Sequence, residues 1–306
     1  MVAGLNIVDV LVRLPQNVQR GEKHEVQDLL VQGGAPAGNA ACLLASLGWR
    51  TGFIARIGSD AMSCIARSEL TRHGVLEDFF IRDERSTPGV SVVEVEPSSG
   101  ERTVLYSLKG YCSLKSDDIP VSEVKRAKLV LVDGYETEAA LVMLESIQRT
   151  SCHSVLDIEA GESETLRRLI ELGTDIILPL AAAKKLSGKL QIPEALRELS
   201  TWTAGQVIAT DGVNGSWAYM LDGILHQPAF KVEALDTTGC GDAYHGAYAS
   251  ALLDGLPLHL RMEFASWIAA QVALSLGGRS NLPTRESMKR GNLAVLSHEL
   301  RQHVES

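Results

Sequence analysis

The sequence lacks the features that mark a membrane protein or a nucleic-acid-binding protein. No run reaches the roughly 18 to 20 uninterrupted apolar residues that a membrane span requires. The N-terminus has no basic segment followed by an apolar one, which is the pattern of a signal peptide. Lysine and arginine do not cluster, and the formal net charge of −9 would repel a phosphate backbone. We therefore expect a cytoplasmic protein with neither a membrane nor a nucleic acid as partner.

Cysteine is also sparse and offers no framework. The 5 cysteines are an odd number, and none stands in a CxxC or other metal-binding spacing, so we expect reduced thiols. The chain has no low-complexity tract, and its 45% apolar and 22% charged residues are typical of a globular protein. Its 306 residues are enough for one large domain with an appendage or for two ordinary domains.

Apolar, β-branched segments alternate with amphipathic ones along the chain. This alternation predicts an α/β fold with a mainly parallel sheet that is covered by helices on both faces. The expected strands lie in residues 51–58, 127–134, 154–159, 175–180 and 205–210. The clearest helix is expected over residues 36–47, with Pro36 near its start and Gly48 just past its end.

Two regions depart from the alternation. Residues 9–31 and 88–108 have the pattern of hairpins and predict a small β-sheet. The remaining residues, 1–8, 32–87 and 109–306, would then form the large α/β domain. A sheet of this kind can serve as a lid that swings on its crossing strands, or it can be a surface decoration; the pattern alone leaves both open.

The stretch 236–247, DTTGCGDAYHGA, combines an anion site with a carboxylate. Gly239, Cys240 and Gly241 present consecutive amides ahead of a predicted helix, and free amides at a helix N-terminus bind phosphate. Asp242 beside them suits phosphoryl transfer, in which it would accept the proton of an attacking hydroxyl. An N-capping aspartate after a tight turn is the simpler alternative. Tyr244 and His245 are expected to be packing residues.

The same stretch resembles the second signature of the PfkB/ribokinase family of carbohydrate and nucleoside kinases. The segment GGAPAGNAACLLASLGWRTGFIARIGSD resembles the first signature, and TDGVNGSWA, HQPAFKVEALD and LSLGGRSNLP fall where the family has related segments. The resemblance therefore extends over essentially the whole chain. It implies a ribokinase-like three-layer α/β/α domain with a mainly parallel central sheet and a small β-sheet lid.

The resemblance also implies an activity, the transfer of the γ-phosphate of ATP to a sugar hydroxyl. Asp242 matches the family's general base, and the amides of Gly239, Cys240 and Gly241 match its anion hole. Cys240 replaces the usual alanine, and its thiol would make the site sensitive to alkylation. Many relatives pair through the lid sheet, so a homodimer formed through the lid is expected.

For the sugar, the resemblance implies contacts near the first strand and the first signature. The implied residues are Asp9 at the end of the first strand, Gly33 and Gly34, Asn39, Asn6 and Lys23. Asn39 stands one position later than the family's usual asparagine, where this chain has Gly38. For the nucleotide, Thr210, Gly212 and Gly215 match the family's T-x-G-x-x-G segment.

One departure from the family concerns Mg²⁺. Many members have N-x-x-E after a strand, whereas this chain has Leu180 and Ala183 in those positions. Mg²⁺ would then be held mainly by the ATP phosphates and by water. Asp157 and Glu159 are candidates to support it; the alternative is that they are exposed acids at a strand end. Asp236 and Thr237 resemble positions that hold a monovalent cation such as K⁺ in some members.

Other functions are weighed against the sugar kinase. The missing N-x-x-E pair is consistent with a catalytically weakened sugar or nucleotide sensor. An adenosine-like nucleoside is an alternative acceptor, although the lid has few aromatic residues to stack on a base. The first strand is not followed by G-x-G-x-x-G, which argues against an NAD-dependent oxidoreductase. Loops near Arg56, Lys109 and Tyr135 would select the substrate.

Overall fold

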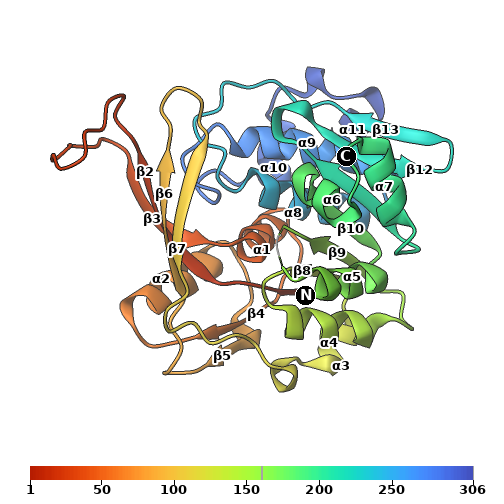
Figure 1. Cartoon of the computed structure of the whole chain (residues 1–306), viewed down its shortest axis with the longest axis horizontal. Coiled ribbons are helices and arrows are strands. Elements are labelled where there is room, and N and C mark those ends of the chain that lie inside the picture. The colour runs from red at the N-terminus through yellow and green to blue at the C-terminus, as the bar shows by residue number, and fades with distance from the viewer. Residues whose placement is uncertain (160, 306) are drawn as a thin grey trace.

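A nine-stranded sheet forms the centre of the large domain (Figure 1). The computed structural model describes residues 1–159 and 161–305. In sheet order the strands are β13 (Gly223–Gln227), β12 (Ser216–Met220), β11 (Gln206–Thr210), β10 (Asp175–Pro179), β9 (His153–Asp157), β8 (Leu129–Asp133), β1 (Val2–Ala3), β4 (Phe53–Ile57) and β5 (Phe80–Arg82). From β11 to β5 all neighbours are parallel, whereas β12 and β13 are antiparallel. The five strands expected from the sequence are thus confirmed.

Helices cover both faces of this sheet. One layer contains α1 (Pro36–Ser46), α8 (Cys240–Leu253) and α9 (Leu258–Val272), and the other contains α3 (Val121–Arg126), α4 (Thr137–Ile147), α5 (Ser163–Leu172), α6 (Leu180–Ser187) and α7 (Ile192–Ser200). The remaining helices are α2 (Ala61–Arg72), α10 (Arg285–Lys289) and α11 (His298–Glu305). None of the helices in the described part of the chain is both long and apolar enough to cross a bilayer.

Each central strand contributes to two hydrophobic cores. In β8, Leu129 and Leu131 pack with α1, α8 and α9, whereas Val130 and Val132 pack with the helices of the opposite layer. Side chains alternate between the faces of a strand, so a strand covered on both faces must be apolar throughout. This requirement explains why the central strands have unbroken apolar sequences, and the three-layer α/β/α prediction is confirmed.

The second sheet has four strands and stands beside the large domain as a lid (Figure 1). Its order is β3 (Leu29–Gly34), β2 (Ile7–Arg13), β6 (Gly89–Val95) and β7 (Arg102–Ser107). The pairs β2–β3 and β6–β7 are antiparallel hairpins, and β2 and β6 join them in parallel. Because β3 continues to Gly34, the lid sheet includes residues that the sequence pattern assigns to the large domain.

The first strand expected from the sequence is split between the two sheets. The chain leaves the central sheet after Ala3 and enters the lid at Ile7, so Asp9 is the third residue of a lid strand. At the crossing, the amide of Leu5 donates to Asp133 Oδ2 over 2.9 Å. A Cβ atom at Gly4 would lie only 2.2 Å from the same oxygen, so glycine is needed for this approach.

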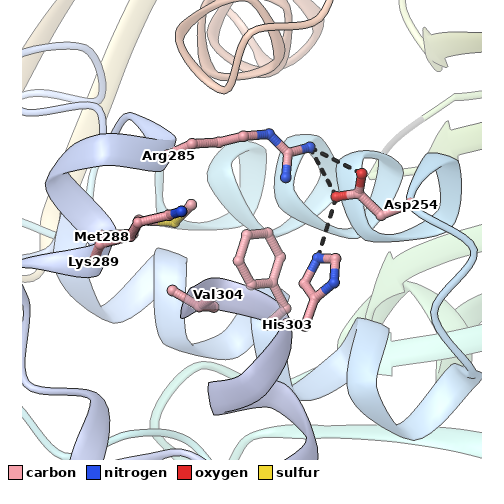
Figure 2. Close-up of a pocket in the computed structure, with 7 residues that line it drawn as sticks. Asp254, Arg285, Met288, Lys289, His303 and Val304 are labelled. Carbon is pink, nitrogen blue, oxygen red and sulfur yellow. Dashed lines mark hydrogen bonds and ion pairs between the residues drawn. The ribbon is translucent and has the colours of Figure 1, made fainter. Parts of the chain in front are cut away.

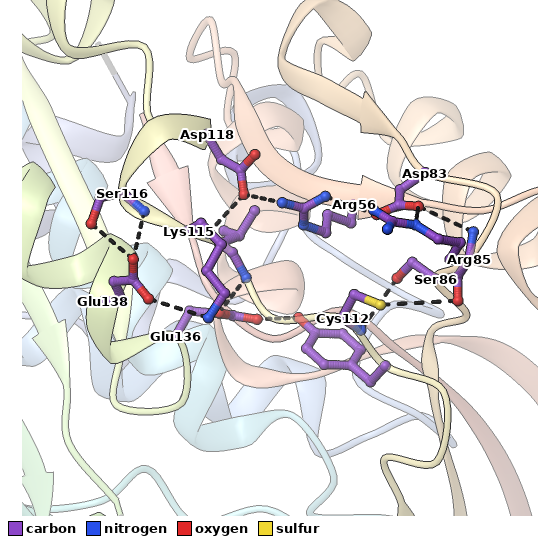
Figure 3. A network of polar contacts seen from close by, with 12 residues as sticks. Arg56, Asp83, Arg85, Ser86, Cys112, Lys115, Ser116, Asp118, Glu136 and Glu138 are labelled. Carbon is purple, nitrogen blue, oxygen red and sulfur yellow. Dashed lines mark hydrogen bonds and ion pairs between the residues drawn. The ribbon is translucent and has the colours of Figure 1, made fainter.

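A polar network fixes the segment that returns from the lid to the large domain (Figure 3). Glu136, which is 2% exposed, accepts from the Tyr111 hydroxyl at one oxygen and from the Leu114 amide at the other. Arg56 bridges Asp83 at 2.9 Å and Asp118 at 2.5 Å. The guanidinium of Arg56, expected near the substrate, is therefore engaged by these two carboxylates.

Burial raises the pKa of Glu136 from 4.5 to about 7, and the hydrogen bond from Tyr111 opposes that rise. The folded protein therefore binds this proton more tightly than the unfolded chain, so stability from Glu136 is fully present below about pH 4.5 and is lost as the pH rises through about 7.

The variant Tyr111→Phe should lower the free energy of unfolding by about 1.5–3 kcal/mol at pH 8.5, where the acceptor Glu136 is charged, and by about 0.5–1.5 kcal/mol at pH 5.5. Thermal unfolding at the two pH values measures the difference.

The matched control is Tyr244→Phe. Tyr244 donates to Ser216 Oγ over 2.9 Å in a buried pair without charge, so its loss should cost the same at both pH values. A pH-independent effect of Tyr111→Phe would contradict the assignment.

Candidate active site

The N-terminus of α8 lies on the side of the large domain that faces the lid, since Thr237, three residues before the helix, bonds to Gly100 of the lid. Gly239 is the N-cap and has φ +77°, a left-handed conformation that favours glycine. A Cβ atom there would lie 2.5 Å from the Cα of Gly278, so the loop before α8 packs directly on a second glycine. A Cβ atom at Gly241 would meet nothing within 4 Å, which leaves open space beside its backbone. The first amides of this 14-residue helix can therefore face an anion.

Asp242 lies in the first turn of α8 and is partly exposed. Its Oδ2 accepts a 2.5 Å hydrogen bond from Nδ2 of Asn39, which comes from α1. No partner of Oδ1 is found among the described residues, so this oxygen is available to accept a proton from a ligand. The two family signatures thus meet in one contact, although 203 residues separate these side chains in the sequence.

Asp236 ties the loop before α8 to the loop after α9. It is fully buried; Oδ1 accepts from the Thr238 amide over 2.8 Å and Oδ2 from the Gly277 amide over 2.7 Å. Thr237 faces the lid instead, where its amide and its hydroxyl both donate to Gly100 O over 3.0 Å. The tip of the β6–β7 hairpin is therefore docked on the loop that holds the anion site.

On the lid side, Asp9 points toward the same space. It is 5% exposed and accepts from Ser91 Oγ on the neighbouring strand. Burial raises the pKa of Asp9, and the nearby charge of Asp242 adds to the effect. A Cβ atom at Gly34 would lie 2.1 Å from Asp9 Oδ2, so this glycine makes room for the carboxylate. Gly33 has a different neighbour, since its Cβ atom would lie 2.1 Å from Arg279 Nη1.

Two further expected sugar ligands differ in placement. Asn6 is 1% exposed, and neither atom of its amide has a hydrogen-bond partner among the described residues. Such an orphaned amide can donate to one hydroxyl and accept from another. Lys23 lies in the exposed loop between β2 and β3, which projects beyond the lid in Figure 1, and no contact joins it to the other candidate residues.

Two acids lie at the carboxyl end of β9, where Asp157 is the last residue of the strand and Glu159 comes two residues later. Asp157 is 2% exposed, its Oδ2 lies 3.3 Å from His245 Nδ1, and its Oδ1 has no partner among the described residues. Burial and then the charges of Glu159 and Asp242 raise the pKa of Asp157. Desolvation of the carboxylate and the charge of Asp242 likewise raise the pKa of Glu159 to about 7. The cleft therefore holds closely spaced carboxylates.

The residues that stand in the family's N-x-x-E positions are core residues. Leu180 is 6% exposed and Ala183 is fully buried, and both pack in the core shared by α4, α5 and α7. Within the described ranges, no group of three or more His, Cys, Asp and Glu side chains is arranged to hold a metal ion. A cation that keeps most of its ligands from phosphates and water needs only one or two protein carboxylates, and Asp157 and Glu159 are the described residues expected to supply them.

The expected nucleotide residues lie together at the end of β11. Thr210 ends that strand, and Gly212 begins the 3₁₀ turn η3 (Gly212–Asn214). Gly215 has φ +92°, and a Cβ atom there would lie 2.1 Å from Gln227 O on β13. Glycine at this position allows β12 to turn closely against β13.

The thiol of Cys240 is not the activated nucleophile that alkylation would require. Burial raises its pKa to about 12, so the thiol stays protonated at neutral pH. The expected sensitivity to alkylation therefore has no support in the thiol's surroundings. Tyr244 and His245, expected to be packing residues, are 5% and 3% exposed, and His245 also makes polar contacts with Gly241 O and Asp157.

Sequence reasoning missed several polar residues of the site. Ser91 and Arg102 come from the lid, His245 contacts Gly241 O over 2.7 Å, and the fully buried Arg279 contacts Asn39. Arg102 donates to Thr237 Oγ1 over 3.3 Å, and its positive charge opposes the rise in the pKa of Asp9 and of Glu159. Ser91 and Arg102 stand in no quoted segment, and neither His245 in the second signature nor Arg279 in LSLGGRSNLP matches a motif position with a known role, so only the folded arrangement reveals them.

A separate cavity of about 300 Å³ lies near α10 and α11 (Figure 2). Its wall includes Asp254, which accepts from Arg285 at both oxygens. Asp254 is the C-cap of α8 and Asp242 is in the first turn, so the two are roughly 18 Å apart along the helix at 1.5 Å per residue. This cavity is therefore separate from the first turn of α8, where Asp242 lies.

The fold and the site together define a small-molecule kinase of the ribokinase-like class: a three-layer domain, a β lid, an anion site and an adjacent carboxylate. The family model described as pfkB family carbohydrate kinase matches residues 2–285. The chain therefore belongs to the pfkB family of carbohydrate kinases.

Curated relatives and solved structures agree with this assignment. The chain is 27% identical to a 5-dehydro-2-deoxygluconokinase of Clostridium tetani, over 84% of this chain and 82% of that protein. It is 26% identical to a fructokinase of Klebsiella pneumoniae, over 84% and 91%. The ribokinase of Arabidopsis thaliana, solved with ribose and ATP, superposes with a TM-score of 0.80 at 21% identity and covers 97% of this chain and 98% of its own.

Proposed function

We propose that this kinase transfers the γ-phosphate of ATP to a sugar hydroxyl, with Asp242 as general base and the amides of residues 239–241 as the anion hole. The observation that supports this most strongly is the placement of Asp242. Its Oδ1 has no partner among the described residues, its Oδ2 accepts from Asn39, and the N-terminus of α8 lies directly beside it. A carboxylate next to an anion site would repel the anion unless the two groups serve different partners. In this proposal Asp242 faces the sugar hydroxyl and the amides of residues 239–241 face the phosphate.

The chemistry follows from this geometry. Asp242 takes the proton of the acceptor hydroxyl as its oxygen forms a bond to the γ-phosphorus, and the bond to the bridging β-oxygen breaks to release ADP. The helix amides stabilise the charge on the transferred group without reorganisation. Asp9 and the unpartnered amide of Asn6 orient the sugar, and Thr210, Gly212 and Gly215 border the nucleotide.

Mg²⁺ is implied by the family, and the residues present fit a supporting role. Asp157 Oδ1 is a buried oxygen without a partner, and Glu159 lies in the same cleft. These two carboxylates would face the phosphate-bound ion, directly or through water. When bound, Mg²⁺ neutralises charge on the ATP phosphates.

We propose that the lid contributes residues to the site. Gly100 accepts two hydrogen bonds from Thr237, and Arg102 brings a positive charge to an otherwise acidic cleft. Closure would exclude water, which otherwise competes with the sugar as acceptor.

Replacing Asp242 with asparagine keeps the shape and removes the base. We expect kcat to fall by about 10²–10⁴-fold, while ATP binding persists because the amides and the nucleotide turn are intact. Steady-state ADP release and nucleotide titration measure the two effects. Asp222→Asn, at an exposed turn, should leave both unchanged. Turnover near the wild-type rate in Asp242→Asn would contradict the assignment of Asp242 as general base.

The acceptor is expected to be a ketose, an aldose or a sugar acid, the classes to which the named relatives' substrates belong. A coupled ADP-release screen over these classes, with and without K⁺, should give sugar-dependent turnover. K⁺ is included because Asp236 and Thr237 match positions that hold a monovalent cation in some members. If no sugar supports turnover but a ligand raises the melting temperature, the sensor alternative gains support.

A nucleoside acceptor is the second candidate. Tyr106 of the lid is 63% exposed and lies in the same cross-strand row as Asp9, and Tyr135 of the large domain is 38% exposed. Two tyrosines bordering one cleft could stack on a base. Adenosine therefore belongs in the same screen, and a preference for it over every sugar would replace the sugar assignment.

We also propose that the protein dimerises through the lid. On the face opposite Asp9, the residues Val31, Val10, Val92 and Leu105 form one cross-strand row, and all but Val10 are at least 40% exposed. Both β3 and β7 are open edges. Light scattering should give twice the mass of the chain, and Leu105→Glu should give a monomer whereas Val18→Glu, in the exposed loop, should not. A monomeric wild type refutes this arrangement.

A further inference from the structure

Arg279 is a buried cation whose charge is not neutralised locally. It is fully buried, and no carboxylate among the described residues lies within ion-pair distance of it. Burying a charge without a counter-ion is unfavourable, so the position of Arg279 needs a reason beyond packing. It lies in the loop that follows α9 and reaches across to α1 and β3.

The guanidinium makes two well-formed hydrogen bonds. Nε donates to Asn39 Oδ1 over 2.7 Å, and Nη2 donates to Gly34 O over 2.6 Å. Two glycines provide the space, because a Cβ atom at Gly33 would lie 2.1 Å from Nη1 and one at Gly38 would lie 2.6 Å from Nη2. The first signature is thus shaped around this arginine, and Gly38, which displaces the usual asparagine by one position, is part of that space.

The contact with Asn39 determines which way its amide points. An amide has one accepting end and one donating end. Since Arg279 can only donate, it requires the oxygen of Asn39, and the NH₂ group must then face Asp242, where it donates to Oδ2 over 2.5 Å. With the amide reversed, two oxygens would face each other at this distance.

We propose that Arg279 is a positioning residue for the general base, acting through Asn39. Arg279 holds the amide of Asn39, Asn39 holds one oxygen of Asp242, and the other oxygen is left to receive the proton of the acceptor. Arg279 itself touches no reacting group. The inference rests on the proposed role of Asp242.

Other charged groups lie around Asp242. They are Asp9 on β2, Arg102 on β7, Asp157 at the end of β9, Glu159 two residues further on, and Cys240 and His245 on α8. The charge of Arg279 also acts on this set, since it opposes the rise in the pKa of Asp9. Arg279→Met therefore removes both a charge and the contact with Asn39, whereas Arg279→Lys keeps the charge, so a shift of the acid limb in the lysine variant reports on the contact.

The test is a double-mutant cycle with Arg279→Met and Asn39→Ala. Each single variant should lower kcat by about 10–100-fold, because a misplaced catalytic group costs on that order, while KM for the sugar changes little. In Arg279→Met the acid limb of the kcat/KM profile should move to higher pH, because Asn39 no longer holds its donor toward the carboxylate. The double variant should be no slower than Asn39→Ala, since both changes remove one interaction.

Arg261→Met is the matched control. Arg261 lies on α9, 3.5 Å from Asp175, at the opposite end of the central strands. It should lower stability without moving the acid limb. If Arg279→Met does not fold, Arg279→Lys keeps the charge but cannot serve both acceptors, and it should show the same shift in the acid limb with a smaller loss of kcat.

Additive losses in the double variant, or an unchanged acid limb in a folded Arg279 variant, would overturn the inference. Failure of the proposed function gives a different result. If Asp242→Asn keeps its turnover, the base assignment fails whatever Arg279 does. If Asp242→Asn is inactive while the cycle is additive, only the role of Arg279 fails.

Discussion

The site depends on how closely α8 can approach α1. A Cβ atom at Gly246 would lie 3.0 Å from Ala40 O, so a larger residue would push the two helices apart. Several buried residues of α8 are small, including Ala243, Ala247 and Ala251, which favours a close approach. Only at this separation can Asn39 reach Asp242. The catalytic contact is therefore a consequence of backbone packing in the core, and the same contact brings the two family signatures together.

The topology places the remaining parts around that contact. Parallel strands end at one edge of the sheet, and ligands in such folds bind beyond their carboxyl ends. Asp133 and Asp157 pair across β8 and β9 at this edge, yet they differ in use. Asp133 accepts from the backbone of residues 5, 135 and 136 and holds the crossing into the lid. Asp157 keeps one oxygen without a partner among the described residues, which is why we propose it, and not Asp133, as a support for Mg²⁺.

The sequence predicted the elements whose signals are local. Central strands such as β8 are recognisable because burial on both faces requires an unbroken apolar run, and Asp242 is recognisable because its glycines precede a helix. The split of the first strand was not predictable, because it depends on a hydrogen bond between Leu5 and Asp133, 128 residues apart. Arg279 was missed for the same reason: a lone arginine in a glycine-rich loop has no local pattern, and its partners come from β3 and α1. The expected sensitivity of Cys240 to alkylation finds no support for a similar reason, because the burial that raises the pKa of its thiol is a property of the folded chain.

The docking of Gly100 on Thr237 links the lid to the anion site. Thr237 directly precedes the loop whose shape Asp236 fixes, so the closed lid and the ordered loop stabilise each other. Such coupling is reciprocal: a phosphate that orders the loop favours closure, and a sugar that closes the lid tightens phosphate binding by the same factor. For the proposed kinase, synergy between the two substrates would need no separate allosteric element, because one threonine belongs to both structures.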